Sequence, residues 1–277
     1  MKKSFFSIVA LFTFLQVTTA QKTDPSKDWT IGVQLWTFNT SSFVEAIENA
    51  KTAGLTYVQA YPGQKLGGSF KGQFDQSLDA ATRKQVKDFV KSKGIIINAF
   101  GVTGADNAAE WKKIFDFAKF FNIPVIVAEP GVNQWDLVDK LAGEYHIKIA
   151  IHDHPKPSHY WHPDSVLAAI KNHPNIGACA DLGHWTRNGL NLVDCLKKLQ
   201  GRIYNVHVKD VDTFNKVDAE DVVPGKGVID FTAVFKELKR QNFKGSFSIE
   251  HESNFGHNVG EVKDIVAFYH QQVAALK

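Results

Sequence analysis

Five polar residues stand where short, apolar, β-branched runs end: Glu129, His152, Asp181, His207 and Glu250. Strands of a parallel sheet are normally apolar on both faces, because helices cover one face and a core fills the other. Polar residues at the same relative place in five such runs therefore indicate one shared site. Two imidazoles, an aspartate and one or two glutamates form a mixed nitrogen and oxygen donor set, which suits Mn²⁺, Zn²⁺, Co²⁺ or Fe²⁺.

Each of these residues also has a simpler role open to it. A histidine at a strand end is usually a hydrogen-bonded residue of the core or rim. Asp181 could cap a following helix, and Glu250 could pair with Lys209. Taken together, however, four unpaired buried polar groups would each be costly, so a convergent metal site is the favoured interpretation.

Eight strand-like runs alternate with helical patterns along the chain, and this alternation predicts a parallel sheet. Eight units in about 250 residues match a single α/β domain folded as a (β/α)₈ TIM barrel. A doubly wound open sheet is the alternative, but it would usually carry a glycine-rich turn after the first strand, where this chain has "TFNTSS". The predicted strands are Ile31–Trp36, Thr56–Tyr61, Ile95–Phe100, Pro124–Glu129, Ile147–His152, Ile176–Asp181, Ile203–Val208 and Gly245–Glu250.

Side chains alternate along a strand, so each run assigns its residues to two faces. One face is apolar throughout and is expected to meet the helices. The other turns polar toward the carboxyl-terminal end, where the active sites of TIM barrels lie. Besides the five polar strand ends, this interior set contains Gln34, Trp36, Tyr61, Phe100, His154 and Lys209. With Gln34, the aromatic residues Trp36, Tyr61, Phe100, Trp161 and Trp185 are candidates to bind a sugar ring, and rim packing is their alternative role.

The first twenty residues are expected to be a signal peptide rather than part of the fold, which would then span 21–277. Lys2 and Lys3 precede the apolar run "FFSIVALFTFL", and "TTA" precedes Gln21. The apolar run is short for a membrane span, although an uncleaved anchor is the alternative. No cysteine stands at the start of the mature chain. We therefore expect an exported protein, periplasmic or extracellular, with no stable membrane anchor.

The charge balance argues against a nucleic-acid partner. The formal net charge of +3 includes Lys2 and Lys3, so the mature chain stands two units lower, near +1. A nucleic-acid-binding protein would normally show a basic surface. Cys179 and Cys195 could pair, but two cysteines do not make a disulfide scaffold. Homo-oligomerisation is compatible with such a barrel and stays open.

Four motifs carry a family resemblance: "ADLGHW", "NVHVKD", "VPGKGVIDF" and "SIEHE". As a set they resemble the xylose-isomerase-like TIM-barrel superfamily, the sugar phosphate isomerase/epimerase group, over the whole mature chain. The resemblance implies that Asp181, His207 and Glu250 bind a divalent metal. It also implies that His184 and Lys209 lie near the substrate oxygens.

One position departs from that family pattern. Related epimerases typically place glutamates at the ends of strands five and eight, where one removes a proton and the other returns one to the opposite face. This chain has His152 at the end of strand five, followed by Asp153 and the catalytic candidate His154. With His152 as a metal ligand, the two-carboxylate relay is incomplete, and Glu129 is either a substitute base or a fifth ligand. Chemistry that needs a single base is therefore favoured over 3-epimerisation.

The expected chemistry starts from a divalent ion that chelates a ketone oxygen and the adjacent hydroxyl. The ion acidifies the neighbouring C–H bond and stabilises the enediolate, and a carboxylate takes the proton. Reprotonation then gives isomerisation or epimerisation, whereas loss of a β-oxygen gives elimination.

Export favours a neutral sugar over a sugar phosphate. None of the four arginines of the mature chain lies on the interior face, so no phosphate clamp is indicated. We expect a lyase or hydrolase that cleaves 3-keto-glycosides by removing the C2 proton and expelling the C1 substituent. A free-ketose isomerase or epimerase is the alternative. A non-catalytic sugar-binding barrel is less favoured, and an endonuclease IV-like enzyme is least favoured because it needs a basic face.

Overall fold

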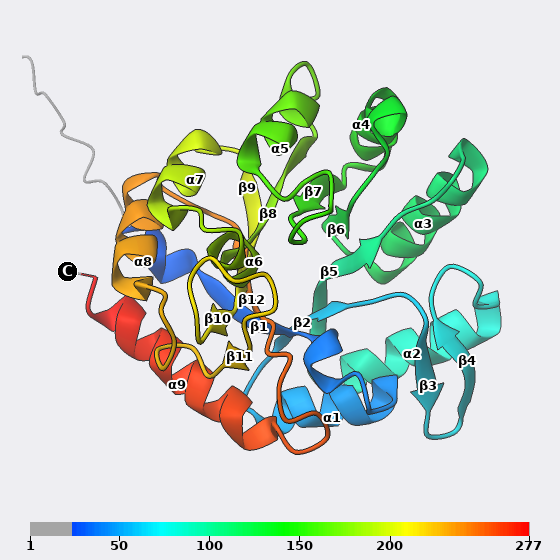
Figure 1. Ribbon diagram of the computed structural model, residues 1–277. Helices are drawn as coiled ribbons and strands as arrows, with labels where there is room; N and C mark the ends of the chain where they lie inside the picture. The colour runs from blue at the N-terminus through cyan, green and yellow to red at the C-terminus, as the bar shows by residue number, and fades with distance from the viewer. Residues whose placement is uncertain (1–23, 277) are drawn as a thin grey trace, which may run out of the picture.

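The computed structural model of the chain describes residues 24–276, so the expected signal peptide lies outside the described residues. Eight parallel strands close into a barrel in the order β1-β2-β5-β6-β7-β8-β9-β12, with helices around it (Figure 1). This confirms the predicted TIM barrel. The barrel strands are β1 Thr30–Gln34, β2 Tyr57–Ala60, β5 Ile96–Thr103, β6 Val125–Ala128, β7 Lys148–His152, β8 Ile176–Asp181, β9 Ile203–Val208 and β12 Ser246–Ile249.

Side-chain caps fix where several of the helices begin. Ser42 and Glu45 form a capping box at the start of α1, and Asp79 and Asn107 cap α2 and α3 through their side-chain oxygens. The α-helices are α1 Phe43–Thr52, α2 Ala80–Ser92, α3 Ala108–Phe121, α4 Trp135–Tyr145, α5 Pro163–Ile170, α6 Leu182–Arg187, α7 Leu192–Lys198, α8 Phe231–Arg240 and α9 Val259–Ala274. Short 3₁₀ helices are η1 Pro25–Asp28, η2 Leu35–Phe38 and η3 Val132–Gln134.

Two small antiparallel hairpins were not predicted, and both lie in connections between barrel strands and the helices that follow them. One joins β3 Gln64–Gly67 to β4 Phe70–Phe74, and the other joins β10 Asp210–Val211 to β11 Asp221–Val222. Figure 1 shows β10 and β11 near the middle of the ring of helices, whereas β3 and β4 lie at its edge. Asp210 anchors the segment after β11, because its carboxylate accepts hydrogen bonds from the backbone N–H groups of Gly225, Gly227 and Ile229.

The barrel interior is narrow and is filled partly by the small residues Ala99, Val127, Ala150 and Cys179. Register shifts disturb the regular alternation of side chains at three places in the barrel, and two of them each insert a single residue. In β5, Ile97 pairs with Val58 and Ala99 pairs with Gln59, so Asn98 is an extra residue in the strand. In β9, Ile203 and Asn205 pair with consecutive residues of β8, so Tyr204 is extra. A bulge of this kind exchanges the faces of the residues that follow it.

The bulge in β5 corrects the predicted position of Phe100. Alternation from Asn98 placed Phe100 inside the barrel, but Phe100 pairs with Ala60 and packs on the helix side. Its ring centroid lies 5.2 Å from that of Phe117 on α3 and 6.0 Å from that of Phe74. Phe100 is fully buried in this core and is absent from the barrel mouth.

Two further structural points concern the cysteines and the possibility of a membrane-spanning helix. Cys179 and Cys195 are both buried free thiols rather than a disulfide. Within residues 24–276, no helix combines the length and the apolar character needed to cross a membrane.

Candidate metal centre

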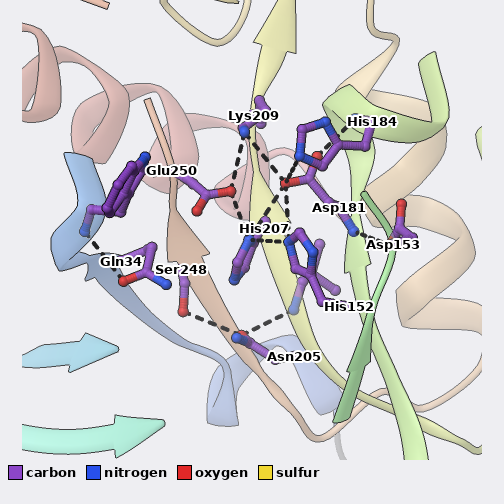
Figure 2. A network of polar contacts seen from close by, with 12 residues as sticks. Gln34, His152, Asp153, Asp181, His184, Asn205, His207, Lys209, Ser248 and Glu250 are labelled. Atoms are coloured by element: carbon purple, nitrogen blue, oxygen red, sulfur yellow. Dashed lines mark hydrogen bonds and ion pairs between the residues drawn. The ribbon is translucent and has the colours of Figure 1, made fainter. Parts of the chain in front are cut away.

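Four buried side chains bring potential ligand atoms together at the carboxyl-terminal end of the barrel (Figure 2). They are His152 from β7, Asp181 from β8, His207 from β9 and Glu250, directly after β12. Their ligand atoms all lie within 4.8 Å of one another. The two imidazoles face each other, with His152 Nε2 3.3 Å from His207 Nδ1. The strand ends singled out by the sequence thus do meet, with Glu129 outside this group of four.

Asp181 serves two purposes with its two oxygens. Oδ1 accepts a hydrogen bond from the backbone N–H of His184 at 2.8 Å and so caps α6. Oδ2 is buried and accepts no hydrogen bond from the residues that the structure describes. Nevertheless it faces His207 Nδ1 at 3.4 Å and His152 Nε2 at 3.7 Å. The structure therefore confirms the helix cap, and the cap leaves the second oxygen available to a metal ion.

A buried hydrogen-bond chain orients the ring of His207. Its Nε2 lies 3.0 Å from Gln59 Oε1, which can only accept, so the Nε2 position carries the proton. Gln59 Oε1 also accepts from the Asn205 amide at 2.6 Å, and Ser248 donates to Asn205 Oδ1 at 3.2 Å. His207 Nδ1 is the ring nitrogen directed at the cluster, 2.9 Å from Glu250 Oε2. Such outer partners commonly fix the ring of a metal-binding histidine.

Lys209 places a positive charge against the acidic side of the cluster. Its Nζ lies 3.1 Å from Glu250 Oε2, 3.7 Å from Asp181 Oδ2 and 2.8 Å from Glu252 Oε1. Although complete burial opposes it, the charges of Asp181, Glu250 and Glu252 raise the pKa of Lys209 well above its ordinary value. The side chain therefore stays a cation and is unsuited to act as a base.

His184 faces the cluster as a neutral donor. Arginine can only donate, so the 3.2 Å contact from Arg187 Nη1 makes His184 Nδ1 an acceptor and leaves the proton on Nε2. Burial lowers the pKa of His184 well below its ordinary value, which keeps the ring neutral. The Nε2 atom lies 3.9 Å from Asp181 Oδ2. Arg187 itself is held by Asp221, whose Oδ1 is 2.6 Å from Nη2.

Glu129 lies beside the four-residue cluster, on the other edge of the His152 ring. Its Oε1 is 3.7 Å from His152 Nδ1, whereas Nε2 of the same ring faces Asp181 and His207. Glu129 also contacts His154 Nδ1 and accepts from Ser158 Oγ at 3.0 Å. Although burial opposes it, hydrogen bonds from His152 and His154 lower the pKa of Glu129. The geometry therefore separates Glu129 from an ion held by His152 Nε2.

His154 stands at the edge of the mouth, with its side chain 47% exposed. Its ring centroid is 4.4 Å from that of His152 and 5.4 Å from that of His184. Although burial opposes it, the hydrogen bond with Glu129 raises the pKa of His154 above its ordinary value. A histidine with this orientation can exchange a proton with a molecule that enters the mouth.

The predicted sugar-binding residues separate into two groups. Gln34 ends β1 and donates to the carbonyl of Gly101 at 2.7 Å. Trp36, 42% exposed, meets Tyr61 edge to face with ring centroids 5.2 Å apart, just beyond the ends of β1 and β2. Trp161 lies in the loop after β7 with Lys156 Nζ 3.9 Å from its ring centroid. These residues remain candidates to contact a sugar.

Trp185 and Phe100 do not reach the mouth. Trp185 belongs to α6 and is fully buried in the hydrophobic core, so no surface of its ring is open to a ligand. Trp185 follows His184 in α6, where consecutive side chains are turned by about 100°, so the two residues face different layers. The prediction that Trp185 contacts a sugar was therefore wrong, as was that for Phe100, which the bulge in β5 turns toward the helices.

Several residues of the site were absent from the predicted set. Gln59, Asn205 and Ser248 orient His207. They could have been predicted, because each is a polar residue on the interior face of a strand, as the strand-end residues are. Asp153 accepts from the backbone N–H of Asp181 at 2.8 Å. Its burial and the charge of Asp181 raise the pKa of Asp153 well above its ordinary value. Glu252 gave a weaker signal, since it lies beyond the strand.

Comparison with known proteins gives a consistent picture of the family. The family model described as "Xylose isomerase-like TIM barrel" matches residues 47–271. An inosose isomerase of Halalkalibacterium halodurans is 24% identical over 249 residues, which cover 78% of this chain and 85% of that protein. An inosose dehydratase of Clostridium beijerinckii is 28% identical over 164 residues, which cover 53% of this chain and 49% of that protein.

Solved structures show the same fold. The crystal structure of an uncharacterised protein from Parabacteroides distasonis is 34% identical, covers 88% of this chain and 99% of that one, and gives a TM-score of 0.73. The IOLI protein, solved with a bound zinc atom, gives a TM-score of 0.72 at 18% identity, covering 90% of this chain and 99% of that one. At that identity the second likeness concerns the fold alone.

Proposed function

The chain belongs to the xylose isomerase-like TIM barrel family, and from this premise we propose that it is a divalent-metal-dependent, sugar-modifying enzyme. One observation carries the proposal: Asp181 Oδ2 is buried without a hydrogen-bond partner among the described residues, yet it faces two imidazoles. A buried carboxylate oxygen without a partner is costly, and a cation relieves that cost. His152, Asp181, His207 and Glu250 would hold the ion, and their donor set suits Mn²⁺, Zn²⁺ or Co²⁺.

A bound divalent ion supplies a Lewis acid that makes the C–H bond next to a ketone more acidic. The protein must then supply a base, and Glu250 is placed for this role. The contacts of Glu250 with His207 and Lys209 both use its Oε2, which leaves Oε1 as the oxygen that could take a proton. Lys209 offsets the negative charge that develops beside it. His184 offers its Nε2–H to a substrate oxygen.

We propose β-elimination from a 3-keto-glycoside as the reaction. Glu250 takes the C2 proton, the C2–H electron pair forms the C1–C2 double bond, and the C1–O bond breaks. His154, at the edge of the mouth, provides the proton that the departing oxygen needs. A dehydratase among the relatives supports elimination, since dehydration also expels an oxygen substituent. The export expected from the first twenty residues supports a neutral substrate.

Isomerisation or epimerisation of a free ketose is the second candidate, because one relative is named an inosose isomerase. The two functions separate when protein loaded with Mn²⁺ is incubated with p-nitrophenyl 3-keto-glucoside and, separately, with a free ketose. Release of nitrophenol with an unchanged ketose supports elimination. A changed ketose without nitrophenol release supports the isomerase, and no reaction of either compound supports a non-catalytic sugar-binding barrel.

Replacing Glu129 with glutamine is expected to lower turnover by about 10- to 100-fold, while one ion per chain is still bound at saturating metal. The reason is geometric: Glu129 lies on the Nδ1 side of His152 and positions this ring and that of His154. Turnover and metal content, measured by mass spectrometry, test this.

The matched control for Glu129 is Glu144→Gln, an exposed surface residue whose change should leave both quantities unchanged. Loss of the ion in Glu129→Gln would instead make Glu129 a ligand. A loss of turnover beyond about 10³-fold with the ion retained would make it the base.

A further inference from the structure

A cavity of about 580 Å³ opens at the amino-terminal end of the barrel, opposite the metal centre. The first residues of several barrel strands line it, among them Thr30, Tyr57, Lys148 and Ser246. TIM-barrel enzymes carry out their chemistry at the other end, so the proposed function makes no use of this cavity. Its volume falls within the range of about 300 to 1,000 Å³ that is usual for small-molecule sites.

The extra residues of two strand bulges line this cavity. Asn98 and Tyr204 are the extra residues in β5 and β9, and both line the cavity. Bulges commonly redirect a side chain beside a functional site. Without a bulge, side chains alternate between the two faces of a strand, so only one of two consecutive residues would face the interior.

Asn98 carries the strongest indication of a ligand. It is 9% exposed, and neither Oδ1 nor Nδ2 makes a hydrogen bond to any residue in the range 24–276. A buried amide with both atoms unpaired destabilises a protein, whereas leucine of similar size would not. An amide at this position therefore suits recognition better than it suits packing.

Aromatic rings form the walls, and glycines make room for them. Tyr57, Tyr204 and Phe243 all line the cavity. A Cβ atom on Gly177 would lie 2.5 Å from Cε2 of Tyr204, and one on Gly245 would lie 2.5 Å from the Phe243 ring. The same Cβ atoms would lie 2.3 Å from the backbone oxygen of Arg202 and 2.4 Å from that of Tyr204, so a larger residue would displace both backbone and ring.

We propose that this cavity is a second ligand site for a neutral ring compound with adjacent hydroxyl groups, such as a glycoside. The Asn98 amide offers an NH₂ group that donates and a carbonyl oxygen that accepts, which match two neighbouring hydroxyls. Aromatic faces pack well against the C–H face of a sugar ring. The charged residues that line the cavity are Asp28, Lys148 and Lys244, of mixed sign, so the lining does not select strongly for an anion.

Methyl β-D-glucopyranoside is the probe, and the side-chain amide signal of Asn98 in a nitrogen–proton NMR spectrum is the readout. We expect saturable shifts with a Kd on the order of 1 mM. The same shifts should occur in the Asp181→Asn protein, whose metal centre is impaired. Asn98→Leu should weaken binding by about tenfold or more, as read from neighbouring backbone signals. Turnover at the metal centre should not change, so this test is independent of the proposed reaction.

Asn98→Ala is the second variant, and Asn133→Leu, at an exposed position of η3 at the other end of the barrel, is the control. Asn98→Leu should leave the melting temperature equal or higher, because it removes an unpaired buried amide. The proposal is overturned if the Asn98 signal does not shift at about 100 mM probe. It is equally overturned if both Asn98 variants bind as well as the parent protein.

Discussion

Asp181→Asn is expected to lose the bound ion and to reduce turnover by at least about 10³-fold. Asparagine keeps the volume of the side chain and is an equally good N-cap, so Oδ1 can still accept from the His184 backbone. The change falls on Oδ2, the atom that faces both imidazoles, where an NH₂ group would now be presented to the ion. Metal analysis and turnover of the purified variant measure both effects.

The control for Asp181 is another helix-capping aspartate. Asp230 Oδ1 accepts from the Ala233 backbone at 2.9 Å at the start of α8, away from the metal centre. Asp230→Asn should therefore keep full metal content and turnover. If Asp181→Asn kept its ion and its activity, the cluster would be a structural polar network rather than a metal site.

Chelation gives a complementary expectation for the parent protein. An ion that binds only the folded state stabilises it, by about 2.7 kcal/mol when the free concentration is 100 times Kd. Removing the ion should lower the melting temperature of the parent protein and leave that of Asp181→Asn unchanged. Equal shifts in both proteins would place the relevant ion elsewhere.

The barrel could be predicted from the sequence because strand position and burial repeat eight times. β8 and β9 begin and end where the hydrophobic runs predicted, and the polar ends of four runs meet in space. Parallel strands leave little freedom here, since their carboxyl ends share one edge. Consequently, even a single sequence indicated which side chains converge.

The errors arose where a strict period of two fails. A single inserted residue in β5 turns Phe100 toward the helices. β1 ends at Gln34, so Trp36 lies in the 3₁₀ helix η2 and not in the strand. No residue type in the segment "IINAFGVT" predicts the bulge at Asn98. The role of Glu129 was open for a different reason: the two nitrogens of His152 face different carboxylates, and ring orientation is not encoded in strand parity.

Glu250→Gln is expected to reduce turnover by about 10²- to 10⁴-fold, since glutamine cannot accept the C2 proton. Its amide oxygen can still approach the ion alongside His152, Asp181 and His207, so much of the metal content should remain. Exchange of the C2 proton with deuterated water should fall together with aglycone release, because both depend on the same base.

Glu252→Gln separates the loss of a base from the loss of a charge. Glu252 contacts the same Lys209 Nζ, at 2.8 Å against 3.1 Å for Glu250, but lies outside the four-residue cluster. Although burial opposes it, the charges of Lys209 and His207 hold the pKa of Glu250 low, so Glu250 is ionised and ready to accept a proton. If Glu252→Gln were as inactive as Glu250→Gln, the essential feature would be the charge balance around Lys209. A large loss confined to Glu250→Gln would identify the atom that takes the proton.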